Sequence, residues 1–123
     1  MGTFQVEVEI GDLQGEQWER LSATVGTRAT FALVPRATLE RLGVEADRRI
    51  PLRHTDGRLI EKNAGQTWLR IGDKSRIGIV IFGEGDDPVL VGMNTLQGML
   101  LEPNFEDAAL VPVVGLMPSR RLA

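Results

Sequence analysis

The sequence has no cysteine and no tyrosine, and a single histidine, His54, among its 123 residues. Without cysteine there is no disulfide framework, zinc–thiolate site or thiol nucleophile. One histidine also argues against a histidine-rich metal site and against most Ser-His-Asp schemes. We therefore expect neither a metal nor a cofactor. A chain of this length forms one domain, or two very small ones, and buries enough surface to fold without either group.

Basic residues are not in excess, and long apolar runs are missing. The chain has 14 Lys and Arg against 17 Asp and Glu, a formal net charge of −3, which leaves no electrostatic footprint for nucleic acid. The apolar stretches at residues 77–82 and 110–114 are far shorter than the roughly 20 residues of a membrane-spanning helix. The N-terminal residues lack a signal-peptide pattern. We expect a cytoplasmic protein that binds neither nucleic acid nor membranes.

The sequence does contain short apolar segments at regular intervals, separated by glycine-rich turns. Residues 4–10 alternate apolar and polar side chains, as in a strand with one buried face. Further strands are expected at residues 17–25, 31–34, 48–53, 58–62, 64–71, 76–82, 89–91, 99–102 and 109–114. Short helices are expected at 36–42 and 93–98, and residues 83–88 are expected to form an exposed acidic loop. This spacing predicts an all-β closed barrel or sandwich with one or two short helices, formed by residues 1–116 and followed by a C-terminal tail, 117–123.

Three segments carry most of the information about function. The first is a loop between an apolar strand and the apolar run before Pro35, made of Gly26, Thr27, Arg28, Ala29 and Thr30. The second is a predicted hairpin turn, whose Asp-Gly pair supplies the positive φ values of a tight turn; it contains Thr55, Asp56, Gly57 and Arg58. The third precedes the second short helix and consists of Leu90, Val91 and Gly92.

Together these segments resemble the retropepsin-like (clan AA) aspartic peptidases, in particular their small bacterial members. The family pattern is an apolar strand, Asp-Thr-Gly-Ala-Thr, an apolar run, and then Pro and a helix that ends in Leu-Gly. The resemblance covers residues 4–116. It implies that residues 26–30 are the active-site loop, that residues 55–58 belong to the flap, and that residues 90–92 are the family's apolar-apolar-Gly motif.

The resemblance also implies a homodimer that binds an extended peptide or protein substrate. In the family, each protomer supplies one Asp, and the two carboxylates share a proton and activate a water against a peptide carbonyl. A hairpin flap closes over the substrate. The last strands and the loops of residues 26–30 are then expected at the two-fold interface.

The sequence departs from the family pattern at its centre. Gly26 stands where the family has its catalytic Asp, and Arg28 stands where the motif has its glycine, while Thr27, Ala29 and Thr30 match. Because glycine has no titratable group, the dyad chemistry is missing at this position, and we assign no catalytic residue. Paired Arg28 side chains could instead hold a carboxylate or a phosphate.

The sequence therefore predicts a non-catalytic peptidase homologue, a pseudoenzyme that binds extended peptides in the flap cleft mainly through backbone hydrogen bonds. Two alternatives stay open. One is an active aspartic peptidase with a non-standard site, for which Asp56 is the only acid to consider, or an engineered inactive form. The other is an unrelated small β-barrel interaction module, structural or similar to toxin–antitoxin proteins.

Overall fold

The first two strands follow the alternation of apolar and polar side chains. The computed structural model of the protein describes residues 2–120. Its first strand, β1 (Phe4–Gly11), buries Phe4, Val8 and Ile10 and pairs antiparallel with β2 (Trp18–Val25) along its whole length. The predicted N-terminal hairpin is thus confirmed.

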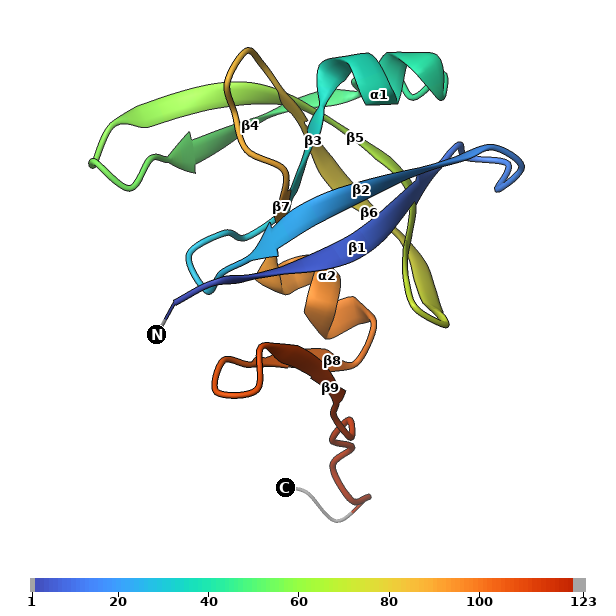
Figure 1. Ribbon diagram of the computed structural model, residues 1–123, viewed down its shortest axis with the longest axis vertical. Helices are drawn as coiled ribbons and strands as arrows, with labels where there is room; N and C mark the ends of the chain where they lie inside the picture. The colour runs from blue at the N-terminus through green and yellow to red at the C-terminus, as the bar shows by residue number, and fades with distance from the viewer. Residues whose placement is uncertain (1, 121–123) are drawn as a thin grey trace.

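The remaining elements complete a sheet that closes on itself. In chain order they are β3 (Ala32–Pro35), α1 (Arg36–Arg41), β4 (Arg48–Arg53), β5 (Leu59–Ile71), β6 (Lys74–Gly83), β7 (Leu90–Val91), α2 (Met93–Gly98), β8 (Leu101–Asn104) and β9 (Ala109–Pro112). The main sheet has the order β1-β2-β7-β3-β6-β5-β4, and β1 also pairs with β5. This extra pairing makes a ring and leaves β4 as a free edge outside it (Figure 1). The predicted all-β fold, a barrel or sandwich with one or two short helices, is confirmed.

The apolar core lies inside the ring and beneath the two helices. Each helix contributes one fully buried leucine, Leu39 from α1 and Leu96 from α2. Gly43, with a φ of +72°, ends α1 in the left-handed conformation that helix C-termini favour. Among residues 2–120, neither helix is long and apolar enough to cross a membrane.

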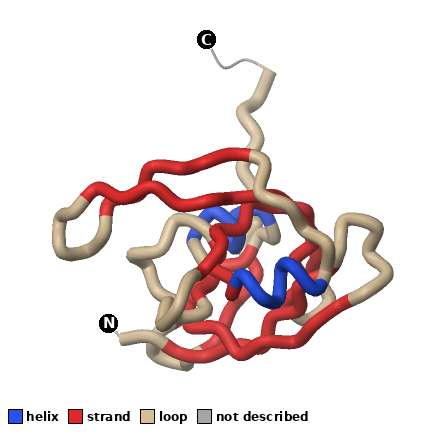
Figure 2. The backbone as a smooth tube through the Cα atoms, turned by 90° about the horizontal axis from the view of Figure 1, so that it is seen from above, coloured by secondary structure: helices blue, strands red, loops and turns tan. Residues whose placement is uncertain are grey.

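Several strand boundaries differ from the prediction: β8, for example, covers residues 101–104 instead of 99–102. The largest difference is in β5. The sequence predicts separate strands at residues 58–62 and 64–71, but β5 is a single strand of 13 residues. Its first part pairs with β4 and its second part with β6, and Ala64 takes part in both pairings. The change of partner at Ala64 therefore occurs without a break in the strand. As a result, the β4–β5 hairpin is a continuous extension of the barrel wall, and it projects away from the ring (Figure 2).

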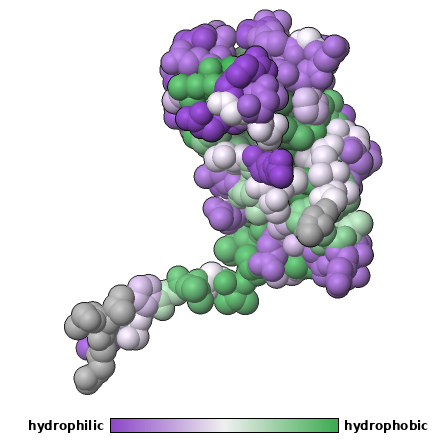
Figure 3. Space-filling view, turned by 90° about the vertical axis from the view of Figure 1, so that its left-hand side faces the viewer, coloured by the Kyte–Doolittle hydropathy of each residue, from purple (hydrophilic) through white to green (hydrophobic). Residues whose placement is uncertain are grey.

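The C-terminal strands form a second, small sheet that packs against the core through Leu101. β8 and β9 make a two-stranded antiparallel sheet separate from the ring. After β9 the chain carries exposed apolar side chains, with Val114, Leu116 and Met117 each more than nine-tenths exposed, and it leaves the body of the molecule (Figure 3). Within the predicted tail, residues 117–119 adopt no helix or strand. Residues 121–123 lie outside the described residues.

Candidate functional site

Two of the three sequence segments pack directly against each other. The loop of residues 26–30, called here the motif loop, lies over the start of α2. The backbone N–H of Met93 donates to the Ala29 carbonyl at 2.9 Å, and the N–H of Asn94 donates to the Thr30 carbonyl at 2.9 Å. A Cβ at Gly92 would lie 2.4 Å from backbone atoms of Thr30, so only glycine allows this approach. These contacts fix the path of the motif loop.

The strands on either side of the motif loop add to this support. The loop connects β2 to β3, and β7 lies between these two strands in the sheet. Thr24 in β2 and Leu33 in β3 both pair with Leu90. The backbone N–H of Thr24 also donates to the Val89 carbonyl at 2.9 Å. Residues 90–92 therefore hold both ends of the motif loop, while the side chains of Thr27 and Arg28 remain exposed.

The remaining segment, residues 55–58, forms the tip of the β4–β5 hairpin. The backbone N–H of His54 donates to the Arg58 carbonyl at 2.7 Å, and Gly57 closes the turn with a φ of +96°. The Asp56 carboxylate accepts the Arg58 backbone N–H at 3.0 Å and its guanidinium at 2.8 Å. These two hydrogen bonds, the backbone one first, lower the pKa of Asp56. Asp56 thus stabilises the turn, and its side chain does not line the cleft described next.

A cleft of about 570 Å³ separates the motif loop from the β4–β5 hairpin. Most of its apolar lining comes from strands, because Leu52 and Ile60 lie opposite each other on the hairpin and Leu33, Ile81 and Leu90 come from the ring. The other lining residues are polar, charged or loop residues, namely Arg28, Ala29, Thr30, Phe31, Arg53, His54, Thr55, Lys62, Asp87 and Pro88. Part of each predicted segment therefore lines one cleft, through residues 28–30, Thr55 and Leu90. The lining does not include the other predicted site residues, which are Gly26, Thr27, Asp56, Gly57, Arg58, Val91 and Gly92.

An ion pair joins the hairpin to the loop that follows β6. Lys62 Nζ donates to Asp87 Oδ2 at 2.6 Å, and the Glu84 backbone N–H donates to the same oxygen at 2.9 Å. The pKa of Asp87 is lowered, first by the Glu84 N–H and then by Lys62. The sequence predicted an exposed acidic loop here, but Asp87 is half-buried. Its partner stands 25 residues away, so no local pattern could reveal it.

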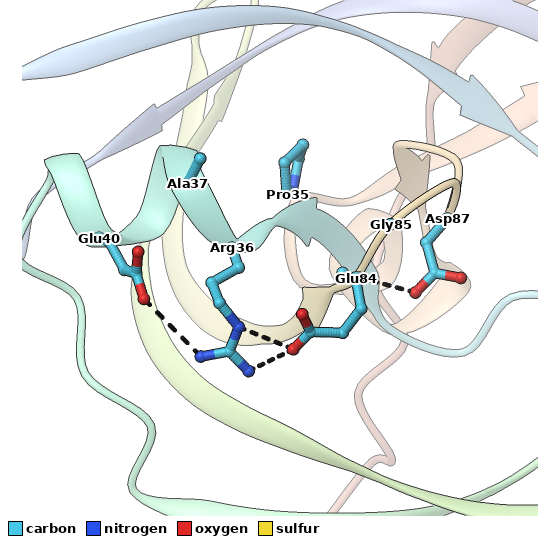
Figure 4. Close-up of a pocket in the computed structure, with 8 residues that line it drawn as sticks. Pro35, Arg36, Ala37, Glu40, Glu84, Gly85 and Asp87 are labelled. Atoms are coloured by element: carbon cyan, nitrogen blue, oxygen red, sulfur yellow. Dashed lines mark hydrogen bonds and ion pairs between the residues drawn. The ribbon is translucent and has the colours of Figure 1, made fainter.

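A smaller hollow of about 340 Å³ lies between α1 and the same loop (Figure 4). Its charged groups bind each other: Arg36 Nε donates to Glu84 Oε2 at 2.7 Å, and an Arg36 Nη lies 3.9 Å from Glu40. The hydrogen bond from Arg36 lowers the pKa of Glu84. The side chains of Arg36, Glu40 and Glu84 are therefore already paired with one another, and they connect α1 to the loop after β6. We do not expect these three charges to bind a ligand.

The motif loop has space for an acidic side chain at position 26, although Gly26 is not among the residues that line the cleft. A Cβ at Gly26 would meet only Thr3 Cγ2, at an ordinary contact distance of 3.5 Å. Asp87 is the one acid among the lining residues, and it is held by Lys62. Within residues 2–120, no cluster of three or more His, Asp or Glu side chains is placed to hold a metal ion.

Comparisons with protein families and with curated proteins found no match. Chemically, the cleft offers an apolar lining and arginine side chains on both of its sides. It offers no unpaired carboxylate among its described lining residues that could act as a general base.

Proposed function

We propose that the protein is a retropepsin-like peptidase homologue that binds an extended peptide in this cleft without cleaving it. The observation that carries the proposal is the cleft itself, which lies between a projecting hairpin and a motif loop with glycine at the position of the family's acid. The packing of Gly92 beneath the motif loop supports the same proposal, because it links the two segments on which the resemblance rests.

An extended peptide fits the chemistry of the lining. The apolar side chains of Leu33, Leu52, Ile60 and Leu90 are partly exposed, so they can cover apolar ligand side chains and gain hydrophobic free energy. Extended segments also bind through backbone hydrogen bonds, which need no catalytic group. A cleft of about 570 Å³ is within the range that ligand sites occupy. A cytoplasmic location stays a prediction from the sequence.

The test is peptide binding with amide mapping in solution. A set of unstructured peptides is added to isotope-labelled protein, and we expect shifts of the amide signals at residues 28–31, 52–55, 87 and 90, with no peptide cleavage. Ile60→Trp narrows the cleft and should abolish binding. Ile77→Trp places the same change on an exposed position outside the cleft and should leave binding intact. Cleavage by the unaltered protein, or equal binding by the Ile60→Trp variant, would contradict the proposal.

We also propose that two copies associate through the C-terminal hairpin and the segment after it. β8 and β9 form a two-stranded sheet that pairs with no other strand in the described part of the chain, while Leu101 and Leu110 pack it against the core. Next to it, Val114, Leu116 and Met117 expose 91%, 99% and 92% of their surfaces. A second copy that covers this apolar segment would remove it from water.

A further inference from the structure

Arginine pairing differs between the cleft and the rest of the surface. Most described arginines outside the cleft form an ion pair with a carboxylate, namely Arg20, Arg36, Arg41, Arg48, Arg49, Arg58 and Arg70. Arg28, on the motif-loop side of the cleft, has no hydrogen bond or ion pair with any described residue. Arg53, on the hairpin side, donates to the Gly57 carbonyl at 3.0 Å but has no carboxylate partner among residues 2–120.

The charge of the cleft is opposite in sign to that of the chain. The chain has a formal net charge of −3, yet the charged lining is Arg28, Arg53 and Lys62 against Asp87 alone. Lys62 and Asp87 neutralise each other at 2.6 Å, which leaves two guanidinium groups uncompensated on opposite sides of one cleft. Low-dielectric walls concentrate such a field and attract ligands of the opposite charge.

We infer that the cleft selects peptides that carry a carboxylate, and that Arg28 is the side chain that binds it. This inference rests on the proposed function and adds the class of ligand to it. A guanidinium is always charged and presents a planar fork that matches a carboxylate with two parallel hydrogen bonds. Arg28 meets this need because its side chain is exposed and has no hydrogen-bond or ion-pair partner among residues 2–120. Arg53 adds positive field from the other side.

The experiment compares two peptides that differ only in charge. Both are ten residues long, capped at both ends and apolar apart from two central positions, which hold Glu in one peptide and Gln in the other. We expect the Glu peptide to bind the full chain about tenfold more tightly, which corresponds to about 1.4 kcal/mol. The preference should shrink as salt is added. A third peptide with Gln and a free C-terminus tests whether a terminal carboxylate serves equally well.

Two variants with the same change in net charge locate the effect. Arg28→Gln should lower the affinity for the Glu peptide about tenfold, to the level of the Gln peptide, and leave the Gln peptide unchanged. Arg20→Gln is the control, because Arg20 is 65% exposed on β2 and forms only long ion pairs of 3.8 Å; this change should alter neither affinity. Binding of the free-terminus peptide through Arg28 would support the inference with the terminal carboxylate as ligand.

The outcomes separate this inference from the proposed function. Equal binding of the Glu and Gln peptides in the cleft, unchanged by Arg28→Gln, would overturn the inference and leave peptide binding established. A loss that is the same for Arg20→Gln would also overturn it, because the effect would then come from net charge. If none of the peptides binds in the cleft, the proposed function fails and the inference fails with it.

Discussion

Gly26 and Gly92 differ in the space that the surrounding atoms leave for a side chain. At Gly92 a Cβ would lie 2.4 Å from the backbone of Thr30, which cannot move without displacing the motif loop. At Gly26 a Cβ would meet only a methyl group at 3.5 Å. Gly92 is therefore fixed by packing, whereas packing does not require glycine at position 26. Position 26 can receive the acid that the family pattern has there.

The space at position 26 suggests that an aspartate placed there could restore peptidase activity. We expect the double change Gly26→Asp with Arg28→Gly to give the protein peptidase activity at acid pH, because it rebuilds the Asp-Thr-Gly sequence on an intact loop. The rate of hydrolysis should rise at least about a hundredfold above the background without enzyme, which is the low end of what general acid–base groups supply. Hydrolysis of an unstructured peptide, and its block by a pepstatin-type inhibitor, is the measurement.

The matched control is Gly26→Asn with Arg28→Gly, which has the same shape without an ionisable carboxyl group. It should fold and remain inactive. A well-folded Gly26→Asp variant that shows no more hydrolysis than this control would count against a peptidase-type cleft.

Predictions about single residues were confirmed where the structural feature depends only on neighbouring residues in the sequence. Gly57 was expected in a tight turn, and it has a positive φ value of +96°. The pairing of Lys62 with Asp87 was not foreseen, because the two residues are distant in the sequence and meet only when the hairpin lies beside the loop after β6. The cleft was not foreseen for the same reason, because its lining comes from segments spread over residues 28–90.

At the scale of elements, the Lys62–Asp87 pair ties the β4–β5 hairpin to the cleft wall. The pKa of Asp87 is lowered in the fold, so its carboxylate stabilises the protein above the unfolded value of about 3.9. That contribution is lost as the pH falls through the lowered folded pKa. We expect Asp87→Asn to reduce the free energy of unfolding by about 1 kcal/mol at neutral pH. The difference should vanish in strong acid, and urea unfolding across a pH series measures it.

The neighbouring acid provides the control for this experiment. Asp86 is exposed and forms no hydrogen bond or ion pair with another residue among 2–120. Asp86→Asn removes the same charge from the same loop and should leave the free energy of unfolding within about 0.5 kcal/mol of the original. If the two variants lose equal stability, or if the Asp87→Asn loss persists unchanged in acid, the ion pair does not hold the hairpin.

The hairpin also shows why one element boundary was wrong. The sequence predicted strands at residues 58–62 and 64–71, with a break at Asn63. In the structure the strand continues, because Asn63 pairs with Arg49 in β4, and from Ala64 onward the strand pairs with β6. Both partner strands are distant in the sequence from Asn63, so no local pattern shows that the strand is continuous.

At the scale of the whole molecule, the number and spacing of strands predicted the class of fold. The closure of the sheet into a ring depends on pairing between β1 and β5, which are distant in the sequence. β1 meets β5 through the pairs Glu9 with Arg70 and Ile10 with Leu69. Arg70 Nε donates to Glu9 at 2.6 Å, and its guanidinium lies 3.7 Å from the centre of the Trp18 ring. Neither contact has a local signal, so the sequence predicted a barrel or a sandwich without deciding between them.

The apolar side chains after β9, Val114, Leu116 and Met117, are exposed to water, and association with a second copy would cover them. We expect the protein to sediment as a dimer. Val114→Asp with Leu116→Asp should shift it to monomer and weaken its dimerisation at least a hundredfold, since burying either charge without a partner is costly. Leu13→Asp is the control: Leu13 is an exposed apolar residue in the β1–β2 turn, and its change should leave the dimer intact. A protein that sediments as a monomer at all concentrations, or a doubly substituted variant that stays dimeric, would show that this segment is not the interface.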